Sequence, residues 1–112
     1  MGSSQLYYQE NAEKAMNEQE IEVLKKALKK YGKTYEMMVC MEECAELIQA
    51  ISKIIRYPGS NYRHDALIEE MADVLISIEY LKMINGITQE EIDLLISNKL
   101  RRLNYNIDTI DS

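Results

Sequence analysis

Hydrophobic residues recur every three to four positions through most of the 112-residue chain, which is the spacing of one face of an α-helix. Short segments rich in helix-breaking residues interrupt this pattern, and the clearest of them contains the only proline, Pro58. The pattern therefore predicts four helices, at about residues 17–31, 34–56, 65–84 and 88–103.

Local signals mark where these helices begin and end. Asn17 followed by Glu20, and Thr88 followed by Glu91, form capping boxes at two predicted N-termini. The pair Asn85-Gly86 is typical of a helix C-terminus, because glycine adopts a left-handed conformation there at low cost. Glycine and proline are otherwise scarce, and Leu, Ile, Met, Glu and Lys are abundant, which favours an all-α protein.

The chain has the length of one small domain. Its first residues are polar and lack helical periodicity, and its last residues are polar again. We expect a flexible leader, a single all-α domain and a polar C-terminal tail, at residues 1–16, 17–106 and 107–112 respectively. We predict the domain to be a four-helix bundle-like subunit.

The charge balance and the cysteines argue against several classes of protein. A net charge of −6 and a pI near 4.8 disfavour binding to duplex nucleic acid, helix-turn-helix proteins included, because backbone phosphates attract clustered lysine and arginine. Cys40 and Cys44 match neither a redox motif nor a zinc site, so we expect two reduced core thiols. No apolar run is long enough to span a bilayer and no secretory signal opens the chain, so we predict a cytoplasmic protein without membrane contact.

The main functional clue is where the acidic residues fall on the second and third predicted helices. At about 100° per residue, each helix places an i, i+3 pair of carboxylates within its apolar face and the preceding glutamate outside that face. If the two helices pack antiparallel, the inward pairs converge. The inward pairs are Glu43 with Glu46 and Glu70 with Asp73, and the outward residues are Glu42 and Glu69.

Four converging carboxylates require a cation, because an unpaired buried charge is strongly destabilising. Oxygen ligands without nearby histidine or cysteine point to Mg²⁺, with Mn²⁺ and Ca²⁺ as the other candidates. A di-iron carboxylate site fits poorly, because it needs Glu-x-x-His motifs and the only histidine, His64, precedes the third helix. Ion pairs with lysine or arginine from other helices are the structural alternative.

Lys99 also occupies an unusual position. In the predicted fourth helix it falls within the apolar stripe formed by Ile92, Ile96, Leu100 and Leu103. A lysine at such a position either extends its charged end to water or binds an anion. Beside an acidic metal site it becomes a candidate phosphate ligand.

These residues resemble the MazG-like nucleoside triphosphate pyrophosphohydrolases, an all-α family. The family motif is E-E-x-x-E followed one helix later by E-x-x-D. Here the two halves are Glu42-Glu43-Cys44-Ala45-Glu46 and Glu70-Met71-Ala72-Asp73. The similarity extends from about Thr34 to Leu103, and it implies that two central helices carry the two halves of the motif.

The resemblance implies a Mg²⁺-dependent enzyme that cleaves an NTP or dNTP to the monophosphate and pyrophosphate by means of a metal-activated water. The family's metal ligands correspond to Glu43, Glu46, Glu70 and Asp73, with Mn²⁺ as an alternative to Mg²⁺. We assign the positioning or deprotonation of the water to Glu43 or Glu46. We assign phosphate binding to Lys99 and Arg102. We expect Glu42 and Asn106 to contact the metal ligands and not the metal itself.

The third predicted helix also indicates self-association. Ile68, Met71, Leu75, Ile76 and Met83 lie outside the stripe that holds its acidic pair, so the helix is apolar almost all round. A symmetric dimer would cover both sides, whereas a single four-helix subunit hardly does. The resemblance likewise implies a homodimer or a homotetramer built from dimers.

The sequence leaves the preferred base and one alternative function open. The chain has no Trp or Phe, and the available stacking surfaces are tyrosines that also suit helix ends. The alternative is a non-catalytic helical module that binds a nucleotide or metal for regulation or interaction. The tyrosines in question are Tyr35, Tyr57, Tyr62 and Tyr80.

Overall fold

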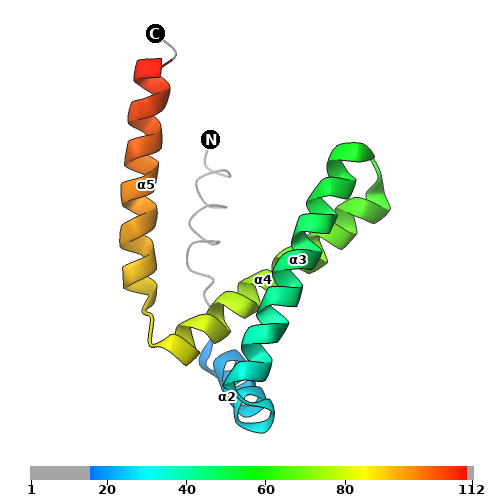
Figure 1. Cartoon of the computed structure of the whole chain (residues 1–112), viewed down its shortest axis with the longest axis vertical. Coiled ribbons are helices and arrows are strands. Elements are labelled where there is room, and N and C mark those ends of the chain that lie inside the picture. Colours follow the sequence, from blue (N-terminus) through cyan, green and yellow to red (C-terminus); the bar gives the residue numbers. More distant parts are fainter. Residues whose placement is uncertain (1–15, 111–112) are drawn as a thin grey trace. The chain divides into compact units, whose positions relative to one another are not determined.

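The structure, a computed structural model, describes residues 16–110, which contain four helices and no strand (Figure 1). The all-α prediction is confirmed for this part of the chain. The predicted leader lies outside the described residues except for Met16, and the domain limits stay a prediction. The helices are α2 (Glu18–Tyr31), α3 (Lys33–Arg56), α4 (Asn61–Asn85) and α5 (Gln89–Ile110).

Helix α2 belongs to a first compact unit that ends at Gly32, and the other three helices belong to a second. The predicted capping box is confirmed: the Asn17 side chain accepts a hydrogen bond from the Glu20 amide at 2.8 Å, and the Glu20 carboxylate accepts one from the Asn17 amide at 2.9 Å. At the other end Gly32 has φ 90°, a conformation that favours glycine, and its amide donates to the Leu28 carbonyl at 2.9 Å.

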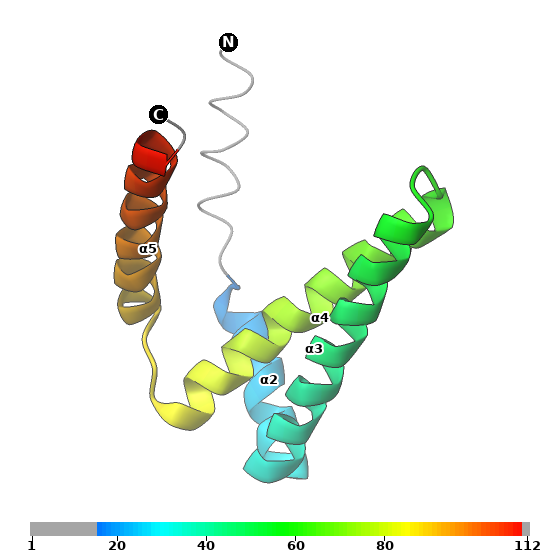
Figure 2. The same ribbon diagram turned by 45° about the horizontal axis from the view of Figure 1, so that its top comes forward.

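Helices α3 and α4 form an antiparallel hairpin and pack against each other along their length (Figures 1 and 2). Residues 57–60, which include Pro58, connect them. Helix α4 begins at Asn61, four residues before the predicted start at residue 65. The reason is Ser60, whose hydroxyl accepts a hydrogen bond from the Arg63 amide at 3.3 Å and so caps the helix immediately after the turn.

The facing sides of the hairpin are the two arcs that helical periodicity predicts, with one exception. Glu46, predicted to point inward, is exposed because it lies about 60° from Glu43, at the edge of the α3 arc. Cys40, Ala50 and Ser77 are buried there, and the Cys40 thiol donates to the Ser77 carbonyl at 3.5 Å. Cys44 is exposed, so the expectation of two core thiols is wrong for this residue, which lies about 100° around α3 from Glu43. The half-buried residues on the arcs are Val39, Glu43, Leu47, Ile54, Ala66, Glu70, Asp73, Val74, Leu81 and Ile84.

The link from α4 to α5 follows the predicted signals. Gly86 ends α4 in the left-handed conformation, with φ 65° and ψ 36°. Thr88 and Glu91 cap α5 reciprocally, with amide-to-side-chain distances of 3.1 and 3.2 Å. Helix α5 then continues to Ile110, past the predicted end at Leu103, because residues 104–110 contain neither glycine nor proline and Ile107 continues the helical spacing of Leu100 and Leu103.

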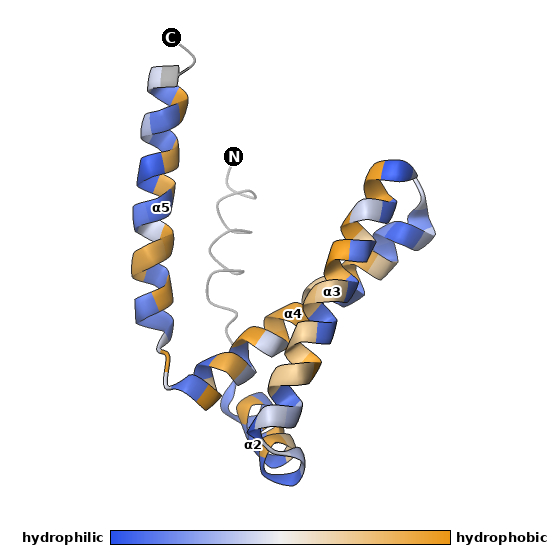
Figure 3. Ribbon diagram, in the orientation of Figure 1, coloured by the Kyte–Doolittle hydropathy of each residue, from blue (hydrophilic) through white to orange (hydrophobic). Residues whose placement is uncertain are grey.

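Much of the apolar surface of α4 and α5 is exposed in the single chain. Figure 3 shows hydrophobic residues interspersed with hydrophilic ones along both helices. On α4, Ile68, Met71 and Leu75 are 54%, 50% and 61% exposed, whereas Ile76 and Met83 are half-buried. A bundle of all four helices, and its assembly into dimers, stay predictions. No helix within residues 16–110 combines the length and apolar character needed to cross a membrane.

Candidate metal centre

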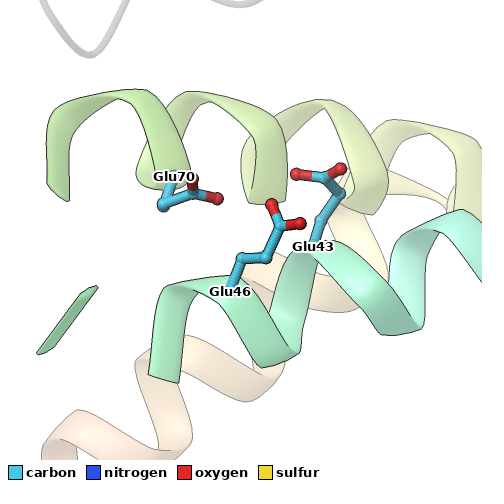
Figure 4. A group of neighbouring side chains, drawn as sticks. All are labelled: Glu43, Glu46 and Glu70. Atoms are coloured by element: carbon cyan, nitrogen blue, oxygen red, sulfur yellow. The ribbon is translucent and has the colours of Figure 1, made fainter. Parts of the chain in front are cut away.

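Three carboxylates converge in the space between α3 and α4 (Figure 4). Glu43 and Glu46 come from α3 and Glu70 comes from α4, and one oxygen from each lies within 4.8 Å of the others. The i, i+3 spacing on α3 places its two side chains on one face of that helix. The antiparallel packing then brings the corresponding face of α4 opposite them.

Asp73 is the fourth predicted ligand, and it lies one turn beyond Glu70 on the same half-buried face of α4. Its carboxyl group is close enough to Glu43 for a hydrogen bond between the two side chains. The structure therefore brings all four predicted ligands together.

The cluster raises the pKa of its own carboxyl groups. The pKa of Glu43 rises from 4.5 to about 7, first through burial, then through the hydrogen bond to Asp73 and repulsion from Asp73, Glu46 and Glu70. The pKa of Glu70 is also raised, first through burial and then through repulsion from Glu46 and a hydrogen bond with it. Without a cation, the carboxyl groups of the cluster therefore hold their protons to a higher pH than isolated glutamates do.

Two carboxylate oxygens of the cluster fit a cation particularly well. Glu43 Oε2 and Glu70 Oε2 are buried and have no hydrogen-bond partner among residues 16–110. No lysine or arginine in that range forms an ion pair with any of the four acids, which argues against the ion-pair alternative. A set of carboxylate oxygens with unused lone pairs matches the ligand preference of Mg²⁺ or Mn²⁺.

The other predicted site residues lie outside the cluster. Glu42 is exposed on the outer side of α3. Lys99, Arg102 and Asn106 are exposed on α5, and in the described part of the chain no ion pair or hydrogen bond joins them to the four acids. His64, which the di-iron alternative would need, has a side chain that is 69% exposed, so that alternative receives no support.

Two polar residues that the sequence pattern did not single out flank the cluster on the same inner faces. Glu36, seven residues before Glu43, is buried and contributes, after burial, to raising the pKa of Tyr80. Arg63, seven residues before Glu70, is half-buried. A seven-residue spacing returns to nearly the same side of a helix, so this spacing was the signal that would have found both.

A helical hairpin that directs four carboxylates into one space forms an acidic cluster of the kind that can hold a metal ion in an all-α protein. Residues 31–105 match the MazG nucleotide pyrophosphohydrolase domain. The chain belongs to this family, which confirms the resemblance found in its motifs. Comparisons with curated proteins and with solved structures gave no match.

In the metal-free protein we expect the melting temperature to fall by a few degrees as the pH rises through neutrality. The folded pKa of Glu43, about 7, is above its ordinary value of 4.5, so its contribution to stability is fully present below pH 4.5 and is lost as the pH rises through 7. Thermal denaturation in a chelator, followed by circular dichroism, measures this. Mg²⁺ should reduce the loss, as should Glu43→Gln, and a flat profile in the chelator would contradict the expectation.

Proposed function

We propose that this protein is a Mg²⁺-dependent nucleoside triphosphate pyrophosphohydrolase. It cleaves an NTP or dNTP between the α and β phosphates and releases the monophosphate and pyrophosphate. The observation that carries the proposal is the convergence of Glu43, Glu46, Glu70 and Asp73 in a chain that belongs to the MazG family. The absence of basic partners for these acids, within the described residues, supports a cation in their place.

The four acids would hold Mg²⁺, or Mn²⁺ in its place. When bound, the ion neutralises charge on the phosphate oxygens and makes a water molecule more acidic. Glu43 or Glu46 accepts a proton from the attacking water as its oxygen bonds to the α-phosphorus. The bond from that phosphorus to the bridging oxygen breaks, and pyrophosphate leaves with the electron pair.

The remaining site residues make their contacts when subunits of the protein assemble. Lys99 and Arg102 of α5 bind the phosphates, and both are exposed in the single chain. Glu42 and Asn106 contact the metal ligands and not the metal itself, or, in the case of Glu42, a neighbouring subunit. A homodimer, or a homotetramer built from dimers, covers the apolar surfaces of α4 and α5 and completes the site. The location we propose is the cytoplasm.

The test is incubation with a panel of NTPs and dNTPs in Mg²⁺, with chromatographic separation of the products. We expect a monophosphate and pyrophosphate in equal amounts, and no turnover when a chelator removes the metal. A diphosphate with inorganic phosphate would contradict cleavage between the α and β phosphates. Tight nucleotide binding without turnover of any substrate would instead support the non-catalytic module.

A further inference from the structure

Arg63 lies on the inner face of the hairpin, between the acidic cluster and the loop at residues 57–60. Seven residues separate it from Glu70, so two turns of α4 place the two residues on one face, about 10 Å apart along the helix axis. Arg63 is half-buried, while Tyr62 and His64 on either side of it are exposed. The inner face of α4 therefore presents a cation two turns from the carboxylates.

The Arg63 guanidinium group is held in place, but its donors are unused. Its central carbon lies 4.0 Å from the centroid of the Tyr57 ring, a cation–π contact that restrains the guanidinium group. Its Nε atom is buried without a hydrogen-bond partner among residues 16–110, and no carboxylate in that range pairs with it. A buried donor without a partner is costly, so an acceptor from outside the described residues would stabilise it.

The neighbouring residues favour a flat, uncharged part of the substrate over its phosphates. Lys53 and Arg56, the other cations at this end of the hairpin, are exposed, so Arg63 is the inward-facing one. The inner positions between Arg63 and the carboxylates are apolar: Ala50 is buried, and Leu47, Ala66 and Leu67 are half-buried. Because the reacting phosphates lie at the carboxylates, a group two helical turns away meets the nucleoside end of the substrate.

The chemistry of a fixed guanidinium group also suggests which base it selects. Its parallel N–H groups match two adjacent acceptors, and O6 with N7 of guanine is the pair that arginine contacts most often. Adenine presents a donor, N6, next to N7, so one of the two hydrogen bonds is replaced by a clash between donors. The free face of an arginine plane is in addition a stacking surface for a base.

We propose that Arg63, held against Tyr57, binds the nucleobase of the substrate and favours guanine over adenine. The inference rests on the proposed function, because it takes the carboxylate cluster as the position of the phosphates. Arg63 is then a residue of the α3–α4 hairpin that determines the substrate specificity of the proposed reaction.

The test compares kcat/KM for GTP and ATP in the full-length protein and its variants. We expect the wild type to prefer GTP about tenfold, and Arg63→Met to lower kcat/KM for GTP about tenfold while the value for ATP stays within about twofold. Arg63→Lys should also lose most of the preference, because lysine keeps the charge but lacks the planar fork. Melting temperatures of both variants verify that the fold is retained.

Arg56→Met is the matched control. The Arg56 guanidinium group lies 5.9 Å from the centroid of the same tyrosine ring, but the residue is exposed. This variant should keep the GTP preference. Equal losses for GTP and ATP in Arg63→Met would assign Arg63 to the phosphates and overturn the inference, and so would an unchanged GTP value.

Calorimetric titration of the same proteins with GTP and ATP in Mg²⁺ separates this inference from the proposed function. A GTP preference that depends on Arg63 but comes with no turnover would overturn the proposed function and support the inference. Turnover with equal affinity for both nucleotides would overturn the inference and leave the proposed function standing. Failure of both nucleotides to bind would overturn both.

Discussion

Glu43→Gln is expected to lower kcat/KM for pyrophosphate release by about 10³-fold or more, because it removes a ligand charge and a candidate proton acceptor together. Glutamine has the same shape as glutamate and can keep the packing between α3 and α4. The loss should therefore appear without unfolding. Steady-state release of pyrophosphate, measured with the best substrate of the panel, gives the value.

Although the activity of Glu43→Gln should fall, its stability should rise. In a chelator, Glu43→Gln removes a carboxyl group whose pKa is raised by burial and by its acidic neighbours, so the melting temperature at pH above 7 should rise. A damaged fold would lower both activity and stability, which makes the two signs together diagnostic. A higher melting temperature would then show that activity is lost because the carboxylate is missing and not because the fold is damaged.

Glu69→Gln is the matched control for this experiment. Glu69 is exposed and lies outside the inward face of α4, although it adjoins Glu70 in sequence. Its replacement also removes one negative charge, from the residue next to the cluster on α4, and activity should stay within about threefold because exposed charges interact weakly. Activity above a tenth of the wild-type value in Glu43→Gln, or equal losses in both variants, would rule out the assigned role of Glu43.

The helices were predictable because helical periodicity and capping are local properties. Asn17 with Glu20, Gly86, and Thr88 with Glu91 each act within one turn of the chain, and each was read correctly. The start of α4 was missed because the Pro58-Gly59 breaker suggested a longer loop than Ser60 allows. A serine can cap a helix directly after a turn, and only the geometry shows that it does so here.

The acidic cluster was predictable because charged residues on an apolar face are rare and an i, i+3 pair is easily recognised. Arg63 was not, because a single arginine near a loop usually remains in solvent. Its contact with Tyr57 depends on the conformation of the turn, which helical periodicity does not describe. The partners of Lys99 could not be predicted from the chain alone, because Ile96, Leu100 and Leu103 of the apolar stripe around it are exposed.

Leu75→Lys is expected to convert the proposed dimer, or dimer of dimers, into monomers and to lower the melting temperature by about 10 °C or more. Leu75 lies with Ile68, Met71 and Ile78 on the side of α4 away from the carboxylates, and all four are exposed in the single chain. A two-fold symmetric interface contains each residue twice, so one substitution places two unpaired charges in it. Light scattering coupled to size-exclusion chromatography measures the mass.

Tyr62→Lys serves as the control, because Tyr62 is 79% exposed on α4 and lies about 140° around the helix from Leu75. It should leave the mass unchanged, and an unchanged mass in Leu75→Lys as well would place the interface elsewhere. The activity of the Leu75→Lys monomer then locates the rest of the site. Loss of turnover, with Mg²⁺ binding retained, would mean that a second chain supplies the phosphate-binding residues, whereas full turnover would mean that one chain contains everything the reaction needs.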